Sequence, residues 1–260
     1  MRLSWIHKYV LDMWEKRCRK YLERSAEKKL RAHTDLWSDL CDYQKRTISS
    51  GASYSDYWLL YSYIRSVQPK EVLECGTGVT TLILAYAMRD NEKNNGVRGR
   101  ITSMESVTEC YESARKLMPE HLRPYVDIVF SPKVEDAYYF FRGVRYESVP
   151  ERSYEFVYID GPGTSAPSDG HKTFNCDLIK VVERSAIPVV ALIDTRMSTC
   201  FVFGLVFKRG KVAYDYRYDV GFVGPVTAND LLSANGVIKA IGPHPLRRGN
   251  VKRLLHSRRA

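Results

Sequence analysis

The strongest constraint on the fold is an alternation of short apolar segments with helical segments between residues 71 and 225. Each apolar segment is rich in Val, Ile or aromatic residues and ends at a glycine or a polar residue, as buried strands do. We expect five of these strands, over residues 71–75, 101–106, 125–131, 155–160 and 187–194. Helices are predicted between them, over residues 80–88, 107–118, 134–144 and 174–184.

Two more apolar runs, residues 201–207 and 212–220, follow the fifth strand. The basic, glycine-containing sequence that separates them predicts an antiparallel hairpin. Strands that alternate with helices form a parallel sheet with helices on both faces. The predicted fold class is therefore α/β, with a doubly wound, mostly parallel sheet, a C-terminal antiparallel hairpin and an N-terminal helical extension.

The positive charge of the chain is concentrated at its two ends. The 260 residues carry a net charge of +10, and residues 1–33 hold ten Lys or Arg against four Asp or Glu. Residues 241–260 hold six against none, so the rest of the chain has a net charge of −2. We expect a basic amphipathic helical extension over residues 1–50, an α/β domain over residues 51–225 and a basic tail over residues 226–260.

These ends, rather than the central fold, are the places where a polyanion such as RNA or an anionic lipid would bind. A solvated tail without a partner is the alternative for the C-terminal end. Apolar residues recur at helical spacing in the N-terminal extension, with basic residues between them. They are Ile6, Val10, Met13, Trp14, Cys18, Tyr21 and Leu22.

Several classes of protein are excluded by composition. The longest apolar runs are too short to span a bilayer, so no transmembrane segment is expected. Lys8, Asp12 and Glu15 interrupt any apolar core of a secretory signal. The six cysteines form no CxxC pair. This pattern predicts neither a zinc site nor a disulfide framework, and it favours a reducing, cytoplasmic location.

The most informative motif is the sequence ECGTGVTT, which begins at Glu74 where the first strand turns into a helix. Gly76 and Gly78 permit a tight turn and the close approach of a ligand to the backbone. Glu105 follows at the end of the second strand, 27 residues after Gly78. A carboxylate at that place can accept hydrogen bonds from the ribose hydroxyls of an adenosine-containing ligand. The alternative is that Glu105 caps the following helix.

This pattern resembles the class I S-adenosylmethionine-dependent methyltransferases, which have a Rossmann-like fold, and it is nearest to their O-methyltransferase-type branch. The resemblance implies S-adenosylmethionine as the cofactor. A nicotinamide-dependent Rossmann enzyme is the main competitor, but it needs a third glycine where this chain has Thr81. The residues that the resemblance assigns to cofactor binding are Glu74, Gly76, Thr77, Gly78, Glu105, Ser106 and Asp160.

The end of the fourth strand narrows the predicted reaction. The sequence Asp160-Gly161-Pro162 lacks the aromatic residue that methyltransferases of exocyclic base amines carry after this strand. The O-methyltransferase resemblance gives catalytic roles to Asp160, His171 and Asp194. His171 would accept the proton of a substrate hydroxyl, because the ordinary pKa of histidine lies near neutrality; a surface histidine without such a role is the alternative.

The same resemblance raises the question of a divalent metal such as Mg²⁺. Asp160 and Asp194 match the two metal-binding aspartates of catechol-type relatives, but Thr195 stands where those relatives have asparagine. Oxygen ligands suit Mg²⁺. In the alternative without a metal, Asp160 bonds to its own loop and Asp194 caps a turn.

The sequence thus predicts an S-adenosylmethionine-dependent methyltransferase that acts on an oxygen of a small molecule or glycan by in-line transfer. One alternative is a methyltransferase of RNA or another polyanion that uses the basic termini. A second alternative is a non-catalytic module that binds the cofactor and takes part in interactions.

Overall fold

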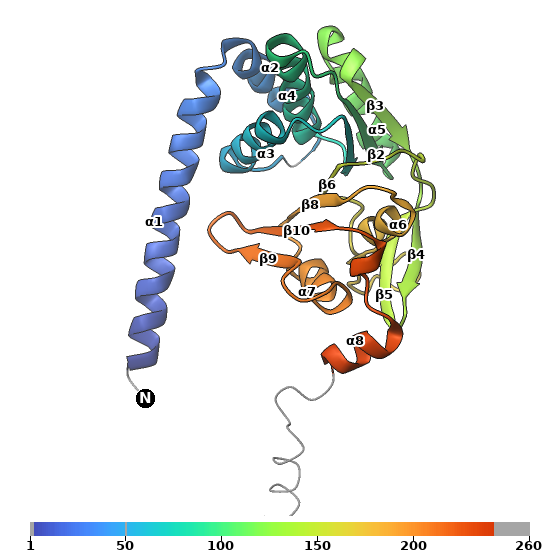
Figure 1. The fold of residues 1–260 in the computed structure, drawn as a ribbon. Coiled ribbons are helices and arrows are strands. Elements are labelled where there is room, and N and C mark those ends of the chain that lie inside the picture. Colours follow the sequence, from blue (N-terminus) through green and yellow to red (C-terminus); the bar gives the residue numbers. More distant parts are fainter. Residues whose placement is uncertain (1–2, 50, 242–260) are drawn as a thin grey trace, which may run out of the picture.

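The computed structural model describes residues 3–49 and 51–241. The centre of this part of the molecule is a seven-stranded sheet (Figure 1). The strand order is β3-β2-β1-β6-β8-β10-β9, and the first five of these are parallel. The chain runs outward from β1 to β3 and then crosses to β6, so the order reverses between β1 and β6. The bounds are β1 Glu71–Cys75, β2 Arg100–Glu105, β3 Val126–Phe130, β6 Phe156–Ile159, β8 Val189–Asp194, β9 Val212–Asp215 and β10 Val220–Val226.

Helices cover both faces of this sheet, which confirms the predicted α/β class. Alternate strand residues point to opposite faces, so Val72 packs with one apolar cluster and Leu73 with the other. The first cluster joins the sheet to α2 Thr34–Arg46, α3 Tyr54–Val67 and α4 Val79–Asn95. The second joins it to α6 Asp177–Arg184, α7 Met197–Val206 and α8 Ala234–Ile241.

The remaining elements complete this frame. The long helix α1 begins the described chain and contacts α3, and α5 packs on β2 and β3. None of the described helices is long and apolar enough to cross a membrane. The basic residues expected in the tail, at residues 247–259, lie outside the described part of the chain. The bounds are α1 Leu3–Arg31, α5 Thr108–Leu117, η1 Glu120–Tyr125 and η2 Ala228–Asp230.

The helix predicted over residues 134–144 is wrong, because this segment forms an antiparallel hairpin. Strand β4, Lys133–Tyr138, pairs with β5, Phe141–Tyr146, around a turn in which Tyr139 has a φ of 54°. Cross-strand ion pairs support the hairpin, such as the 2.7 Å contact between Arg142 and Glu135. Aromatic and β-branched residues favour a half-buried strand over a helix. Strand β7, Phe174–Asn175, pairs with β5, so the helix predicted from residue 174 begins only at residue 177.

The hairpin predicted between residues 201–207 and 212–220 is misplaced. The first run belongs to helix α7, where Thr199, Val202, Phe203 and Val206 are buried at helical spacing. The C-terminal hairpin is formed instead by β9 and β10, around a turn at residues 216–219. A short apolar run does not distinguish a buried strand from a buried helix, because nearly every position in residues 201–207 is apolar.

The packing of the β4–β5 hairpin on the rest of the molecule can be tested at Gly143, with Gly204 of α7 as the control. A Cβ added at Gly143 would lie 2.2 Å from Cys176 Sγ and 2.9 Å from the ring of Phe174. Gly143→Ala should therefore lower the free energy of unfolding in urea by about 1–3 kcal/mol. Gly204 in α7 has no described atom within 4 Å of that position. Gly204→Ala should raise the same free energy by about 0.5–1 kcal/mol, and equal effects of the two changes would contradict this packing.

Candidate functional site

The turn between β1 and α4 brings two strand ends into backbone contact. Gly76 has a φ of +103°, a conformation that favours glycine, and a Cβ there would lie 2.8 Å from Gly161 N. A Cβ on Gly161 would in turn lie 2.6 Å from Gly76 Cα. The ends of β1 and β6 therefore meet with no room for a side chain on either. This contact lies at the strand-order reversal, where open α/β sheets bind ligands.

Glu74 supports this turn from the protein interior. Its carboxylate is fully buried and accepts hydrogen bonds from the hydroxyls of Thr80, Thr81 and Ser103, each at 2.6 Å. Burial raises the pKa of Glu74 to about 7, and the three hydrogen bonds oppose that shift. Thr77 is drawn into the same network through a 2.8 Å contact with the Ser103 hydroxyl. Glu74 and Thr77 therefore stabilise the conformation of the turn by buried hydrogen bonds.

Glu105 lies one strand away, at the end of β2. Its Oε1 accepts hydrogen bonds from the backbone N–H of Ser106 at 2.7 Å and of Val107 at 2.9 Å. One carboxylate oxygen thus orders the two residues before α5. No side-chain hydrogen bond caps the helix at Val107, so Glu105 does not cap α5 as the alternative expected. The contact of Glu105 and Ser106 with a ribose stays a prediction, for which the second carboxylate oxygen of Glu105 is the candidate acceptor.

The predicted aspartates, Asp160 and Asp194, lie side by side on the other flank of the turn. They follow Ile159 and Ile193, which are partners in the parallel pairing of β6 with β8. Asp194 is 7% exposed, and its Oδ1 has no hydrogen-bond partner among the described residues. Burial, followed by the negative charge of Asp160, raises the pKa of Asp194. Burial also raises the pKa of Asp160, while Arg196 lowers it.

Arg196 places a positive charge between these carboxylates and the Gly161 loop. Its guanidinium donates to Asp160 O and, at 3.1 Å, to Pro162 O. Arg196 Nη2 also lies 3.6 Å from Asp160 Oδ1. The Nε atom of this largely buried side chain has no hydrogen-bond partner in the described structure. The sequence interpretation missed Arg196. An arginine after a strand is common, and its proximity to Asp160 is visible only in the folded structure.

The residues present do not fit a divalent metal. Within residues 3–49 and 51–241, no group of three or more His, Cys, Asp or Glu side chains is arranged to hold one. The donor set is two carboxylates, and a guanidinium is already paired with one of them. Thr195, where metal-binding relatives have asparagine, has a φ of 44°. This conformation is strained for a β-branched residue, and its N–H is held by Asp219 O at 2.9 Å.

His171 lies on the exposed part of the loop that follows β6. Its N–H donates to Asp169 Oδ1 at 2.9 Å, and its carbonyl accepts from Ala166 N at 2.8 Å. Asp169 in turn pairs with Arg142 of β5. The contacts of the described residues thus tie His171 to the β4–β5 hairpin and do not bring it to Asp160 or Asp194.

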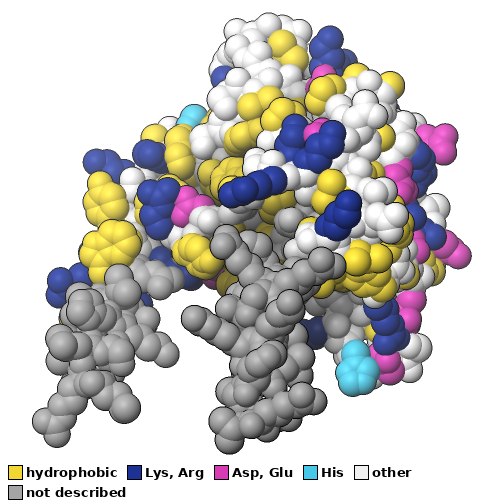
Figure 2. Space-filling model, turned by 60° about the horizontal axis from the view of Figure 1, so that its bottom comes forward, with side chains coloured by type: hydrophobic (Ala, Val, Ile, Leu, Met, Phe, Trp, Pro, Cys, Tyr) yellow, Lys and Arg dark blue, Asp and Glu magenta, His cyan; other side chains and the backbone are white. Residues whose placement is uncertain are grey.

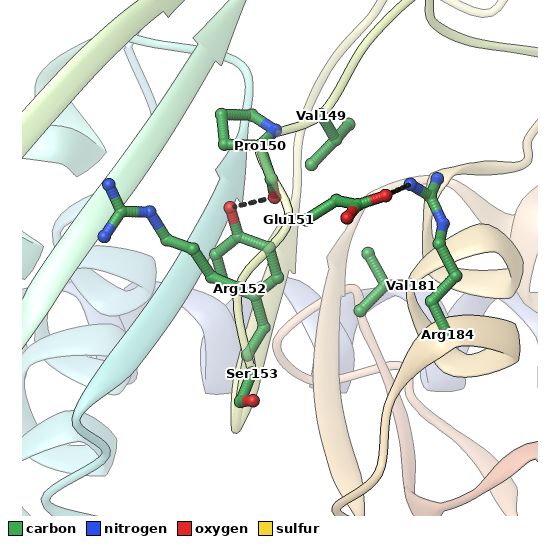
Figure 3. Close-up of a pocket in the computed structure, with 8 residues that line it drawn as sticks. Val149, Pro150, Glu151, Arg152, Ser153, Val181 and Arg184 are labelled. Atoms are coloured by element: carbon green, nitrogen blue, oxygen red, sulfur yellow. Dashed lines mark hydrogen bonds and ion pairs between the residues drawn. The ribbon is translucent and has the colours of Figure 1, made fainter.

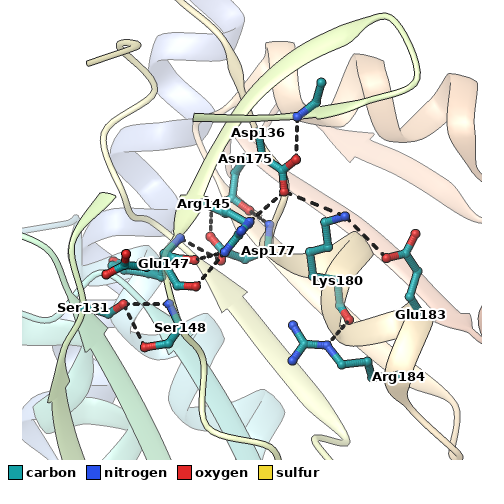
Figure 4. Close-up of polar contacts among 12 residues, drawn as sticks. Ser131, Asp136, Arg145, Glu147, Ser148, Asn175, Asp177, Lys180, Glu183 and Arg184 are labelled. Atoms are coloured by element: carbon teal, nitrogen blue, oxygen red, sulfur yellow. Dashed lines mark hydrogen bonds and ion pairs between the residues drawn. The ribbon is translucent and has the colours of Figure 1, made fainter. Parts of the chain in front are cut away.

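Asn175 and Asp177 fix the Gly161 loop from the opposite face, and the sequence interpretation missed Asn175. Its Nδ2 donates to Gly161 O and to Asp177 Oδ2, each at 2.8 Å. Burial raises the pKa of Asp177 to about 7, although its carboxylate also accepts from Tyr146 N. Figure 4 shows that this buried pair lies beside an ion-pair network around Arg145. The one available signal was the position of Asn175 just before a helix that begins with Asp-Leu.

Two hollows flank the sheet at opposite ends. An open groove of about 370 Å³ reaches Thr195, the residue that follows Asp194. It is lined by residues of α1, of the start of α3 and of the β9–β10 turn, among them Glu23 and Asp56. A cavity of about 390 Å³ includes Pro150 and Arg184 in its lining (Figure 3). The second cavity is formed by the segment that precedes β6 together with Val181 and Arg184 of α6, so it lies at the end of β6 away from Asp160.

Several solved structures of methyltransferases are similar to this chain at low sequence identity. No protein-family model and no curated protein matches the chain. Methyltransferase PaMTH1 of Podospora anserina, solved with S-adenosylhomocysteine, is 14% identical over 65% of this chain, which spans 64% of that protein, with a TM-score of 0.43. A putative caffeoyl-CoA O-methyltransferase from Staphylococcus aureus is 15% identical, with 84% and 98% of the two chains covered and a TM-score of 0.41.

A third solved structure is a putative protein-L-isoaspartate O-methyltransferase from Plasmodium falciparum in complex with S-adenosylhomocysteine. It is 13% identical, covers 66% of this chain and 83% of its own, and has a TM-score of 0.37. The three neighbours belong to the class that the sequence motifs resemble. At these identities, the activity and the substrate have to be inferred from the residues of this chain.

The raised pKa of Glu74 predicts a pH dependence of stability. Between the ordinary pKa of 4.5 and the folded value of about 7, the Glu74 carboxyl group is protonated in the folded protein and ionised in the unfolded chain. Stability should therefore fall as the pH rises through this range, by at most about 1.4 kcal/mol per pH unit for this group. Glu74→Gln should reduce the difference in unfolding free energy between pH 5.5 and 7.5, measured in urea.

The exposed Glu112 of α5 offers the matched control, because Glu112→Gln removes a carboxylate that is not part of this network. An unchanged pH difference in Glu74→Gln would show that its carboxylate titrates alike in the folded and unfolded chains.

Proposed function

We propose that the chain is an S-adenosylmethionine-dependent methyltransferase that methylates an oxygen of a small molecule or glycan. The observation that carries this proposal is the arrangement around the strand-order reversal. The glycine turn, shaped by Glu74, lies between Glu105 on one side and the Asp160–Asp194 pair on the other. A ligand across this edge would meet a ribose acceptor at one end and a proton acceptor at the other.

The residues around the turn fit the chemistry of the cofactor. Gly76 is partly exposed and Gly78 is buried against Ser49. Helix α4 begins directly after Gly78, so its first N–H groups lack partners within the helix. Glu105 offers a carboxylate to ribose hydroxyls, and Ser106 lies next to it. When bound, S-adenosylmethionine supplies a methyl group on a positively charged sulfur, which an oxygen nucleophile displaces in line.

Asp194 is the residue that we assign to the substrate proton. Its buried Oδ1 lacks a partner among the described residues, so it is free to accept a hydrogen bond from a hydroxyl group. Its raised pKa brings it closer to the neutral range in which a general base is most effective. Arg196 holds Asp160 and the Gly161 loop in place. His171 stays the alternative base, and it would have to reach the substrate from its exposed loop.

Cofactor binding is tested by calorimetry with S-adenosylhomocysteine and, separately, NAD⁺. We expect binding of the first and none of the second. Glu105→Gln should weaken S-adenosylhomocysteine binding about 10-fold or more, because it removes a charged hydrogen-bond acceptor. Glu109→Gln, an exposed change on the neighbouring helix, is the control and should bind normally. Binding of NAD⁺ alone would show that the glycine turn belongs to a nicotinamide-dependent enzyme.

Methyl transfer is tested with labelled S-adenosylmethionine and a panel of phenolic, catecholic and glycan acceptors. Asp194→Asn should lower kcat by about 10²–10⁴ without changing S-adenosylhomocysteine affinity, because only proton removal is lost. His171→Ala should have a small effect, and a chelator should have none, since no metal step is proposed.

Loss of activity in His171→Ala with activity retained in Asp194→Asn would reverse the assignment of the base. Normal cofactor binding without transfer to any acceptor would favour the interaction-module alternative. Transfer to RNA alone would favour the polyanion alternative.

A further inference from the structure

Helix α1 has an inward face that is firmly attached to the body. Glu23 accepts hydrogen bonds from the backbone N–H of Tyr54 at 2.8 Å and of Ser55 at 2.9 Å, at the first turn of α3. Arg19 pairs with Asp219 of the β9–β10 turn at 3.3 Å. These contacts fix which side of α1 faces the molecule and therefore which side faces away.

The outward face of α1 carries exposed aromatic residues. Trp14 is 58% exposed and Tyr21 is 72% exposed, and their spacing of seven residues places both on one side of the helix. Met13, also exposed, lies beside Trp14. In the sequence, Ile6 and Val10 continue this spacing toward the N-terminus. Figure 1 shows that this half of α1 extends beyond its contacts with α3, alongside the β9–β10 hairpin.

Basic residues share this outward face. Arg17, Arg24 and Lys28 are exposed and follow Trp14 and Tyr21 at spacings of three and four residues. Figure 2 shows hydrophobic and basic side chains together on the projecting helix at the left of the view.

The nearby described acids are already engaged and do not neutralise this face. Glu23 binds the first turn of α3, and Glu27 pairs with Arg31 at 2.7 Å. Among the described side chains of α1, the outward face is thus aromatic and positively charged.

We propose that the outward face of α1 docks on the surface of a bilayer that contains anionic lipids. A helix with aromatic and aliphatic residues among Lys and Arg lies in the membrane interface, where its rings enter the headgroup region and its charges meet lipid phosphates. A second copy of the chain is a poor occupant, because two faces of equal positive charge repel each other. RNA would engage the charges and could stack bases on the two rings, but it would gain little from burial of the aliphatic Met13.

The test is flotation of the full chain with lipid vesicles. Vesicles of phosphatidylcholine with 30% phosphatidylserine should bind the protein, pure phosphatidylcholine vesicles should bind it at least about 10-fold more weakly, and 0.3 M salt should reduce binding to the anionic vesicles. Trp14→Ser combined with Tyr21→Ser should weaken anionic-vesicle binding about 10-fold or more. Both side chains are exposed, so the variant should keep the unfolding midpoint of the parent.

Two control variants distinguish binding by this face from nonspecific hydrophobic or electrostatic binding to vesicles. Phe140→Ser removes a side chain that is 56% exposed at the β4–β5 turn, and it should bind vesicles like the parent. Arg98→Gln removes an exposed cation elsewhere and should also bind normally, whereas Arg17→Gln combined with Arg24→Gln should not.

Equal binding by the Trp14/Tyr21 variant and the parent would overturn the proposal, and so would binding that is independent of phosphatidylserine. Tight binding of a single-stranded RNA that persists in the Trp14/Tyr21 variant, with no vesicle binding, would assign the face to nucleic acid instead. None of these outcomes depends on methyl transfer, so the docking proposal and the proposed function are judged separately.

Discussion

The contact between Gly76 and Gly161 is the constraint on which the candidate site depends. It sets how closely the ends of β1 and β6 approach, and two buried systems hold it from either face of the sheet. Glu74 ties the β1 side to three hydroxyl groups, and Asn175 holds the Gly161 carbonyl on the β6 side. With both ends fixed, Glu105 and Asp160 are presented at the same edge of the sheet by their own strands.

Several carboxyl groups at this edge are buried, among them Glu74, Asp177 and Asp194, whereas Asp160 is partly exposed. Burial of a carboxyl group costs free energy when the group is ionised. The chain offsets the cost in different ways. Glu74 is surrounded by hydroxyl donors, Asp177 by N–H donors, and Asp160 by the guanidinium of Arg196. Asp194 differs from them, because one of its oxygens is left without a partner in the described structure. A buried carboxyl group with an unpaired oxygen is well suited to exchange a proton with a ligand, even though Arg196 partly stabilises its charge.

The parallel strands and the glycine turn could be predicted because each is a local pattern. Apolar runs bounded by polar residues mark the strands, and only glycine suits the conformation of Gly76. Residues 134–144 and 201–207 were misread, because short aromatic or apolar runs are compatible with strand and helix, and tertiary packing decides between them. Arg196 could not be found from the sequence, since it becomes a neighbour of Asp160 only through the parallel pairing of β6 with β8. Asn175 had only a weak local signal, because it reaches Gly161 from the short strand β7 through the pairing of β7 with β5.

The attachment of α1 connects the outer surface of the molecule to this edge. Arg19 holds Asp219 through its side chain, and the Asp219 carbonyl holds the strained Thr195, which directly follows Asp194. The groove that reaches Thr195 has α1 as one of its walls, because Glu23 lines it together with Asp56. A surface that fixed the orientation of α1 would therefore also fix one wall of this groove. The basic helix is thus a wall of the groove next to Thr195 as well as an extension of the chain.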